Sequence, residues 1–188
     1  MTVILERMAI RDVLRMGHPL LREATVPCDP AFIGSDEFAR LVTDMADTLH
    51  QQGGIGLAAP QIGESRRIAI IEIPGGPSRY GELQSLPLTV FVNPEIEVLS
   101  PEEGGYWEGC LSVPGLRGFV ERPQHVRVRY LSATAERQEL ELTGFYATVF
   151  QHEFDHLDGR LYVDHIKDSR LLVFEEEYER YYAEPVED

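Results

Sequence analysis

The sequence has little positive charge, little cysteine and no long apolar run. It holds 17 Lys and Arg residues against 32 Asp and Glu residues, which gives a net charge of −15. This balance argues against non-specific binding of DNA or RNA and against docking on an anionic membrane, because both need surplus basic side chains. No apolar stretch approaches the roughly 18–20 residues of a membrane-spanning helix. We therefore expect neither DNA nor a membrane among the partners.

Targeting and disulfide signals are also missing. Two cysteines, Cys28 and Cys110, are too few for a disulfide framework. The first 21 residues mix acidic with apolar side chains, and they contain neither the apolar core of a signal peptide nor a basic transit peptide. We expect a protein of the bacterial cytoplasm. Its length predicts a single domain over residues 1–188, of which about 169–188 form an acidic C-terminal helix and tail.

Hydrophobic periodicity predicts helices at both ends of a block of strands. A helical pattern starts after Ser35, a good N-cap, and ends at Gly53. Two further helices are expected, from about Phe145 to Leu157 and from Ser169 to about Tyr182. Between them, short apolar or alternating runs predict strands at Arg67–Ile73, Leu88–Val92, Glu95–Leu99, Val126–Tyr130 and Gln138–Leu142.

Turn-forming residues separate these strands. They are Gly75–Pro77, Asn93–Pro94 and Pro101–Gly105. Helices and strands in separate blocks are typical of an α+β fold rather than an alternating α/β fold.

The strongest chemical signal is the segment His152-Glu153-Phe154-Asp155-His156. Positions i and i+4 of a helix face the same way, so the two imidazoles can bind one cation. Glu153 lies beside the first of them, where its carboxylate can exchange a proton with water held by that cation. The segment therefore predicts a helix that can bind a metal ion.

A catalytic metal site of this kind usually needs a third protein ligand. Tyr162 stands where one extended histidine pattern would place it, so that pattern is incomplete. Glu175 or Glu176 lies downstream at the separation of a Glu-ligated metalloprotease. Cys110, within Glu108-Gly109-Cys110-Leu111-Ser112, offers a thiolate next to glycine. Spacing alone does not choose among these sources.

A third segment, Gly54-Ile55-Gly56-Leu57-Ala58-Ala59-Pro60-Gln61, is rich in small residues. Such residues let the backbone approach a ligand closely. Gln61 supplies neutral N–H donors that suit an oxyanion. The segment is not a dinucleotide-binding fingerprint, because a helix precedes it and a strand follows it.

Together the three segments resemble the motifs of peptide deformylases, GxGLAAxQ, EGCLS and HExDH. The chain has GIGLAAPQ at 54–61, EGCLS at 108–112 and HEFDH at 152–156, in the same order and without a mismatch. The run VLRMGHPLL at 13–21 also looks like the usual start of the family. The resemblance spans about residues 10–166, most of the chain. It implies an α+β fold with small antiparallel or mixed sheets packed around a central metal-binding HExxH helix, followed by a C-terminal helix.

The resemblance implies a hydrolase that removes the N-formyl group from the initiator methionine of new polypeptides and releases formate. It implies one divalent metal ion held by Cys110, His152 and His156, with the fourth position open for water. Iron as Fe²⁺ is the implied native metal, and zinc or nickel can replace it on isolation. Glu153 would be the proton-transfer group. The Gln61 side chain and the Leu111 backbone N–H would stabilise the oxyanion.

The resemblance also implies the residues that contact N-formylmethionyl peptides. Backbone groups of Ile55 and Gly56 could pair with an extended peptide, and an apolar pocket must take the methionine side chain. The predicted substrate-binding set is Ile55, Gly56, Tyr106, Trp107, Glu108, Arg117 and Val149. Some members of the family dock on the ribosome through a basic C-terminal helix, but residues 175–188 here hold seven acids and one base. The resemblance therefore implies at most transient contact with the ribosome, through another surface than this helix.

Two other functions are compatible with parts of the pattern. A zinc endopeptidase would use a third ligand other than Cys110 and would cleave internal peptide bonds. A non-catalytic binding module would need a broken motif, whereas all the motif residues are present here.

Overall fold

The computed structural model describes residues 10–78 and 80–183. The sequence-based expectations for residues 1–9 and 184–188 concern positions outside this range. The helices and strands are η1 Pro19–Arg22, α1 Asp36–Gln52, β1 Gly56–Ala58, η2 Ala59–Ile62, β2 Ile68–Ile73, β3 Gly76–Ser78, β4 Gly81–Leu83, β5 Leu86–Cys110, β6 Val113–Leu131, β7 Arg137–Thr143, α2 Gly144–Leu157, η3 Tyr162–His165, η4 Ser169–Leu171, β8 Leu172–Phe174 and α3 Glu175–Tyr181.

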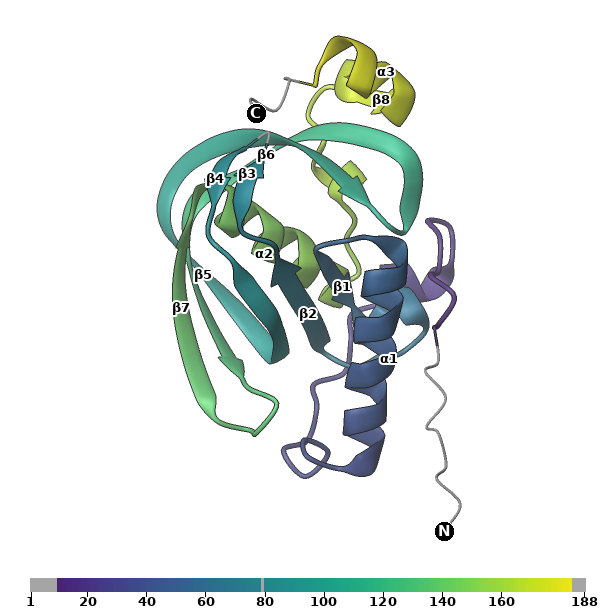
Figure 1. Cartoon of the computed structure of the whole chain (residues 1–188), viewed down its shortest axis with the longest axis vertical. Coiled ribbons are helices and arrows are strands. Elements are labelled where there is room, and N and C mark those ends of the chain that lie inside the picture. Colours follow the sequence, from purple (N-terminus) through teal and green to yellow (C-terminus); the bar gives the residue numbers. More distant parts are fainter. Residues whose placement is uncertain (1–9, 79, 184–188) are drawn as a thin grey trace.

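A six-stranded antiparallel sheet organises the molecule (Figure 1). Its strands lie in the order β1-β2-β5-β6-β7, and β8 pairs with β6 away from this path. Strands β5 and β6 form one long, strongly curved hairpin whose pairing runs from Val92↔Leu131 to Cys110↔Val113. Strands β3 and β4 form a separate two-stranded hairpin. The fold is therefore α+β, as the sequence predicts, with antiparallel pairing in both sheets.

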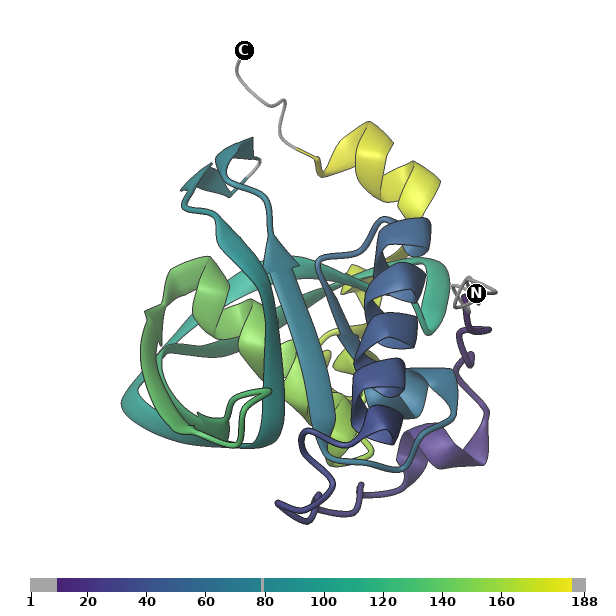
Figure 2. The same ribbon diagram turned by 60° about the horizontal axis from the view of Figure 1, so that its bottom comes forward.

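Strand β2 is buried on both of its faces, which explains its continuous apolar sequence. Successive side chains of a strand point to opposite faces. Ile68 and Ile70 therefore pack in the core that α1 covers, whereas Ala69 and Ile71 pack in the core that contains α2. The ribbon views show the two helices on either side of this part of the sheet (Figure 2). Helix α2 thus shares one core with side chains of β2, β5 and β6.

Helix α1 has the ends that the sequence predicts. The Ser35 side chain accepts a hydrogen bond from the Phe38 N–H at 3.1 Å, and Asp36 and Glu37 lie in the first turn. Gly53 ends the helix with φ +70°, a conformation that favours glycine. The segment 54–61 follows at once, so α1 determines where the chain enters β1.

The predicted breaks between strands at Asn93–Pro94 and Pro101–Gly105 are wrong, because β5 continues through both segments. The pairing register shifts between Val92 and Glu95 and again between Ser100 and Glu103. The turn-forming residues therefore make bulges that bend one strand. Asn93 has φ +48°, and its side chain bonds the backbone N–H and C=O of Cys28 at 2.8 and 2.9 Å.

The predicted C-terminal helix from Ser169 to about Tyr182 is also wrong in its first half. A 3-10 turn over Ser169–Leu171 leads into β8, and α3 starts only at Glu175. The reason is tertiary, since β8 pairs with β6 in the register Leu116↔Phe174 and Gly118↔Leu172. Strand pairing here outweighs helix propensity. No helix in the described part of the chain is long and apolar enough to cross a membrane.

Candidate active site

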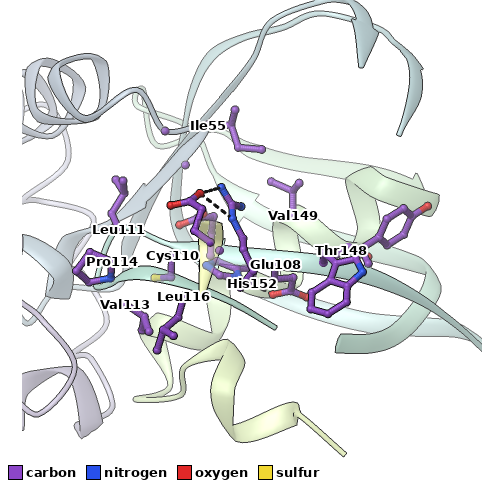
Figure 3. A pocket seen from close by; sticks show the side chains of 18 of the residues that line it. Ile55, Glu108, Cys110, Leu111, Val113, Pro114, Leu116, Thr148, Val149 and His152 are labelled. Carbon is purple, nitrogen blue, oxygen red and sulfur yellow. Dashed lines mark hydrogen bonds and ion pairs between the residues drawn. The ribbon is translucent and has the colours of Figure 1, made fainter. Parts of the chain in front are cut away.

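The three sequence motifs meet in one cleft of about 500 Å³. Segment 54–61 gives one wall, the end of the β5–β6 hairpin gives another, and α2 gives the floor. Figure 3 shows Cys110 and His152 next to each other, with Val113 and Leu116 on one side and Thr148 and Val149 on the other. The sequence-predicted residues that line the cleft are Ile55, Gly56, Gln61, Tyr106, Trp107, Glu108, Cys110, Leu111, Arg117, Val149, His152 and Glu153.

Cys110, His152 and His156 form a group that could hold a metal ion, with ligand atoms within 4.8 Å of one another. Cys110 is the last residue of β5 and precedes a two-residue turn into β6. The α-helical spacing of α2 places both histidines on one face. The distance from Cys110 Sγ to His156 Nε2 is 3.3 Å.

The electrostatics of this group fit a divalent cation. Burial alone would raise the pKa of the Cys110 thiol, but the charge of His156 and hydrogen bonds with both histidines lower it well below its ordinary value. Burial would lower the pKa of His152, yet hydrogen bonds with Cys110 and Glu108 raise it well above its ordinary value. A thiolate and two imidazoles are typical ligands of divalent transition metals.

Glu108 orients the first imidazole from behind. Its Oε2 lies 2.6 Å from His152 Nδ1, which leaves Nε2 of that ring to face the thiol. Arg122 in turn donates to Glu108 Oε1 and Oε2 at 2.6 and 3.1 Å and to Asp155 Oδ2 at 2.7 Å. The Glu108 and Arg122 side chains are almost fully buried, at 5% and 4% exposure. Second partners of this kind fix the tautomer and the direction of a ligand.

The same network sets the charges around the helix. Burial opposes ionisation of Glu108, but the hydrogen bonds from His152 and Arg122 outweigh it and lower the pKa of this carboxyl. Burial would raise the pKa of Asp155, but the hydrogen bond with His165 and the charge of Arg122 outweigh it and lower this pKa to about 2. Glu108 was predicted to contact substrate. The structure gives it several partners inside the protein, and Arg122 is a member of the site that sequence reasoning missed.

Glu153 has no such partner. It is buried, and its Oε2 has no hydrogen-bond partner among the described residues. Burial is the main cause that raises the pKa of this carboxyl. Gly56 of β1 lies directly against it, since a Cβ at this position would be 2.4 Å from Glu153 Cδ. A buried carboxyl with a raised pKa and a free oxygen suits proton transfer.

The Gln61 side chain is held with its amide nitrogen toward the thiol. Its Oε1 accepts from the Ala58 N–H at 2.8 Å. Its Nε2 donates to Ser112 Oγ at 3.2 Å and to Cys110 Sγ at 3.6 Å. The residue is 1% exposed. This fixed donor lies next to the group that could hold a metal, where it can stabilise negative charge on a reacting oxygen.

An aromatic cluster closes one end of the cleft. Tyr80 stacks on Phe145 with ring centres 4.3 Å apart, and both contact Tyr106 edge-on. Tyr80 Oη donates to the Trp107 carbonyl at 3.0 Å. Only Tyr106 and Trp107 were predicted. Tyr80 lies between β3 and β4, in a hairpin that the sequence analysis predicts only as a turn at Gly75–Pro77. Nothing in the local sequence pattern indicated that Tyr80 lines the cleft.

The other sources considered for a third ligand are engaged elsewhere. Tyr162 stacks on the His152 ring at 6.0 Å, and its hydroxyl donates to the Leu116 carbonyl at 3.3 Å. Glu175 forms an ion pair with Arg117. Glu176 is exposed and is not among the described residues that line the cleft.

Comparison with known proteins decides the family. Residues 10–171 match the profile of the polypeptide deformylase family. The chain belongs to this family. A peptide deformylase of Leptospira biflexa is 39% identical over 170 residues, which are 90% of this chain and 95% of that protein. Peptide deformylase 2 of Pseudomonas syringae is 44% identical over 167 residues, 88% of this chain and 92% of that protein.

Solved deformylase structures share the fold. A class I type b peptide deformylase from Acinetobacter baumannii with Met-Ala-Ser bound superposes with a TM-score of 0.79. It is 37% identical and covers 85% of this chain and 100% of its own. A Synechococcus elongatus peptide deformylase in complex with actinonin gives a TM-score of 0.73 at 33% identity, over 87% of this chain and 82% of its own. The deformylase resemblance of the sequence motifs is thus confirmed.

Proposed function

We propose that the protein is a metal-dependent peptide deformylase, which hydrolyses the N-formyl group of the initiator methionine of new polypeptides and releases formate. The observation that carries this proposal is that Cys110, His152 and Glu153 line one cleft of a deformylase-family chain, with His156 beside Cys110 as the third member of the group that could hold a metal. Such a hydrolase needs a metal-ligand set, a proton-transfer group and an oxyanion donor. Gln61 supplies the third of these.

Cys110, His152 and His156 would hold one divalent ion. When bound, the cation acts as a Lewis acid that lowers the pKa of water in the site and polarises the formyl oxygen. We propose Fe²⁺ as the native metal, with Zn²⁺ or Ni²⁺ able to occupy the same ligands. The thiolate and imidazole donors suit all three ions. Metal analysis of protein prepared without oxygen tests the identity.

Glu153 would move the proton. Its carboxylate takes a proton from the attacking water and then delivers it to the leaving amine of methionine. Its raised pKa brings the group closer to neutral pH, where it can serve in both directions. The Gln61 Nε2 and the Leu111 backbone N–H would donate to the oxygen that gains negative charge. Removal of one such donor typically costs about 3–4 kcal/mol of transition-state stabilisation.

The methionine side chain would enter the apolar part of the cleft. Ile55, Val149 and the rings of Tyr106 and Phe145 line that part. The Acinetobacter baumannii relative has Met-Ala-Ser bound, and a tripeptide of this size suits a cleft of about 500 Å³. The backbone at Ile55 and Gly56 would pair with the peptide as an added strand.

The cellular context would be the bacterial cytoplasm, where formylated chains are made. The described relatives are bacterial proteins. We infer that the acidic segment α3 does not dock on ribosomal RNA, because its surface charge opposes the phosphate backbone. Arg180 is the only base in α3, against Glu175, Glu176, Glu177 and Glu179.

The direct test is formate release from formyl-Met-Ala-Ser by protein loaded with Fe²⁺ or Ni²⁺ without oxygen. We expect rapid turnover, and a loss of at least about 100-fold in Glu153→Ala, which removes the proton-transfer group. Glu139→Ala, on the exposed side of β7, is the matched control and should keep full activity. A folded, fully metallated wild type that releases no formate would overturn the proposal.

A zinc endopeptidase is the alternative function, and a Cys110→Ser variant distinguishes it from a deformylase. In the deformylase reading Cys110→Ser removes the thiolate ligand, so metal content and formate release should both fall severely. An endopeptidase with another third ligand would stay metallated in this variant and would cleave unformylated peptides internally.

A further inference from the structure

The C-terminal segment Leu172–Tyr182 forms part of the cleft although the family match ends at residue 171. Strand β8 pairs with β6 directly after the turn that follows Cys110, in the register Leu116↔Phe174. The next residue, Glu175, therefore arrives at the cleft and is one of its lining residues. This segment adds a charged side chain to the site of a deformylase.

Glu175 pairs with Arg117, which is held in place from three sides. Glu175 Oε1 accepts from Arg117 Nε at 3.0 Å and also from Nη2. The guanidinium lies on the backbone of Gly109, where a Cβ would be 2.4 Å from Nη1. The Tyr178 ring centre lies 5.9 Å from Arg117 Cζ. Arg117 thus has a fixed position against Gly109, the residue that precedes the proposed ligand Cys110.

The charges of the cleft make this pair consequential. Among the described residues that line it, Arg117 is the only Lys or Arg. Glu108 also lines the cleft, but Arg122 compensates its charge inside the protein. Glu175 therefore cancels the one guanidinium of the cleft, and without Glu175 this guanidinium would attract acidic groups.

The pair lies at the rim, where a peptide must pass. The Arg117 and Glu175 side chains are 29% and 44% exposed, whereas His152 and Glu153 are buried. An extended peptide advances about 3.3 Å per residue. With the formyl group at the buried ligands, the second and third residues of the peptide reach the rim.

We propose that Glu175 is a specificity-determining residue of the deformylase, which disfavours peptides with an acidic second or third residue and favours basic ones. The inference rests on the proposed function. A purely structural role for the ion pair would instead consist of anchoring α3. Other contacts already anchor that helix, because Trp107 packs on Tyr178 and Tyr182 with ring centres 5.2 and 4.8 Å apart.

The experiment compares formyl-Met-Ala-X amides, with X as Ser, Glu or Lys, on metal-loaded enzyme. In Glu175→Gln we expect the ratio of kcat/KM for the Glu peptide to that for the Lys peptide to rise about fivefold, the effect of one partly exposed charge. The change should lie in KM and should disappear in 1 M salt, where the screening length falls to about 3 Å.

Glu176→Gln is the matched control, since it removes the same charge from the next residue, which does not line the cleft. In this variant the ratio of kcat/KM for the Glu peptide to that for the Lys peptide should change less than about twofold. Arg117→Gln should shift the ratio in the opposite direction to Glu175→Gln, because it leaves Glu175 without its partner.

Two results would overturn the inference. One is that Glu175→Gln scales all three peptides by the same factor, as loss of an anchor would. The other is a shift that persists in 1 M salt or that occurs equally in Glu176→Gln. Failure of the proposed function is distinct, because a wild type that leaves the Ser peptide intact would fail before any comparison of charges.

Discussion

Gly56→Ala tests whether the exact position of the Glu153 carboxyl matters for activity. In the wild type, Gly56 leaves room for this carboxyl against β1. An added Cβ would lie 2.4 Å from Glu153 Cδ and Oε1 and 2.7 Å from Cγ. Ordinary contact begins at 3.4 Å, so the carboxyl must move by about 1 Å. Glu153 is buried at 5% exposure, and the side into which its carboxyl can move is the cleft that it lines.

The size of the effect follows from this displacement. A misplacement of about 1 Å can reduce catalysis by roughly 100-fold, which corresponds to about 2.7 kcal/mol of transition-state stabilisation. The proposed metal ligands come from other positions, so we expect metal content to stay close to that of the wild type. The loss should appear mainly in kcat, because the proposed role of Glu153 is proton transfer in the chemical step.

The assay is steady-state formate release, with metal content and thermal unfolding measured on the same preparations. Gly54→Ala is the matched control, since its only tight contacts would be with the methyl carbons Leu49 Cδ1 and Leu111 Cδ1 at 3.0 and 3.2 Å, and the Gly56 carbonyl would lie at an ordinary 3.6 Å. These side-chain ends can yield by a few tenths of an ångström, so activity should stay within severalfold of the wild type.

Two outcomes would refute the reasoning. A metallated Gly56→Ala that turns over within threefold of the wild type would show that the position of the carboxyl is not limiting. The double variant Gly56→Ala with Glu153→Ala should be no slower than Glu153→Ala alone, because both changes act through one group. Additive losses would indicate that Gly56 acts by another route.

Two further predictions concern stability. Arg122→Met leaves the Glu108 and Asp155 carboxylates without their buried partner, and urea unfolding should show a loss of about 3–5 kcal/mol; a loss below 1 kcal/mol would contradict it. Burial opposes ionisation of Asp164, but the hydrogen bonds from Arg22 and the Leu161 N–H outweigh it and lower the pKa of this carboxyl. Above about pH 4, the free energy of unfolding of the wild type should therefore exceed that of Asp164→Asn by about 0.5 kcal/mol, after allowance for solvent screening. This advantage should decline as the pH falls through the folded-state pKa, and a difference that does not decline as the pH falls below about 4 would contradict the assignment.

Local patterns predicted the elements whose ends are determined by their own residues. Ser35 and Gly53 bound α1 in the sequence and in the structure. The continuous apolar run of β2 and the apolar face of α2 were likewise readable, because both are buried by neighbouring elements. The HExxH spacing predicted the shared face of the two histidines, because positions i and i+4 of a helix point the same way.

Elements that depend on distant partners were not predictable from local patterns. Asn93 and Pro94 look like a turn in sequence, but pairing of β5 with β2 and β6 turns them into a bulge. Segment 172–174 forms a strand only because an edge of β6 is available. Within the site, the partner of Glu108 is Arg122, 14 residues later, and no spacing rule connects an acid with a base across a hairpin.

The curved hairpin of β5 and β6 has a consequence for how this chain can change in length. The direction in which the sulfur of Cys110 points depends on the number of residues that separate it from the register shifts at Ser100–Glu103 and Glu108–Cys110. Side chains alternate along a strand, so deletion of one residue from 104–109 would turn the sulfur to the opposite face. Deletion of two would restore the face but shorten the hairpin by about 7 Å. Length variation among descendants of this chain should therefore concentrate at the far end of the hairpin, around the β6–β7 turn at 132–136, and spare the strand that leads to the ligand.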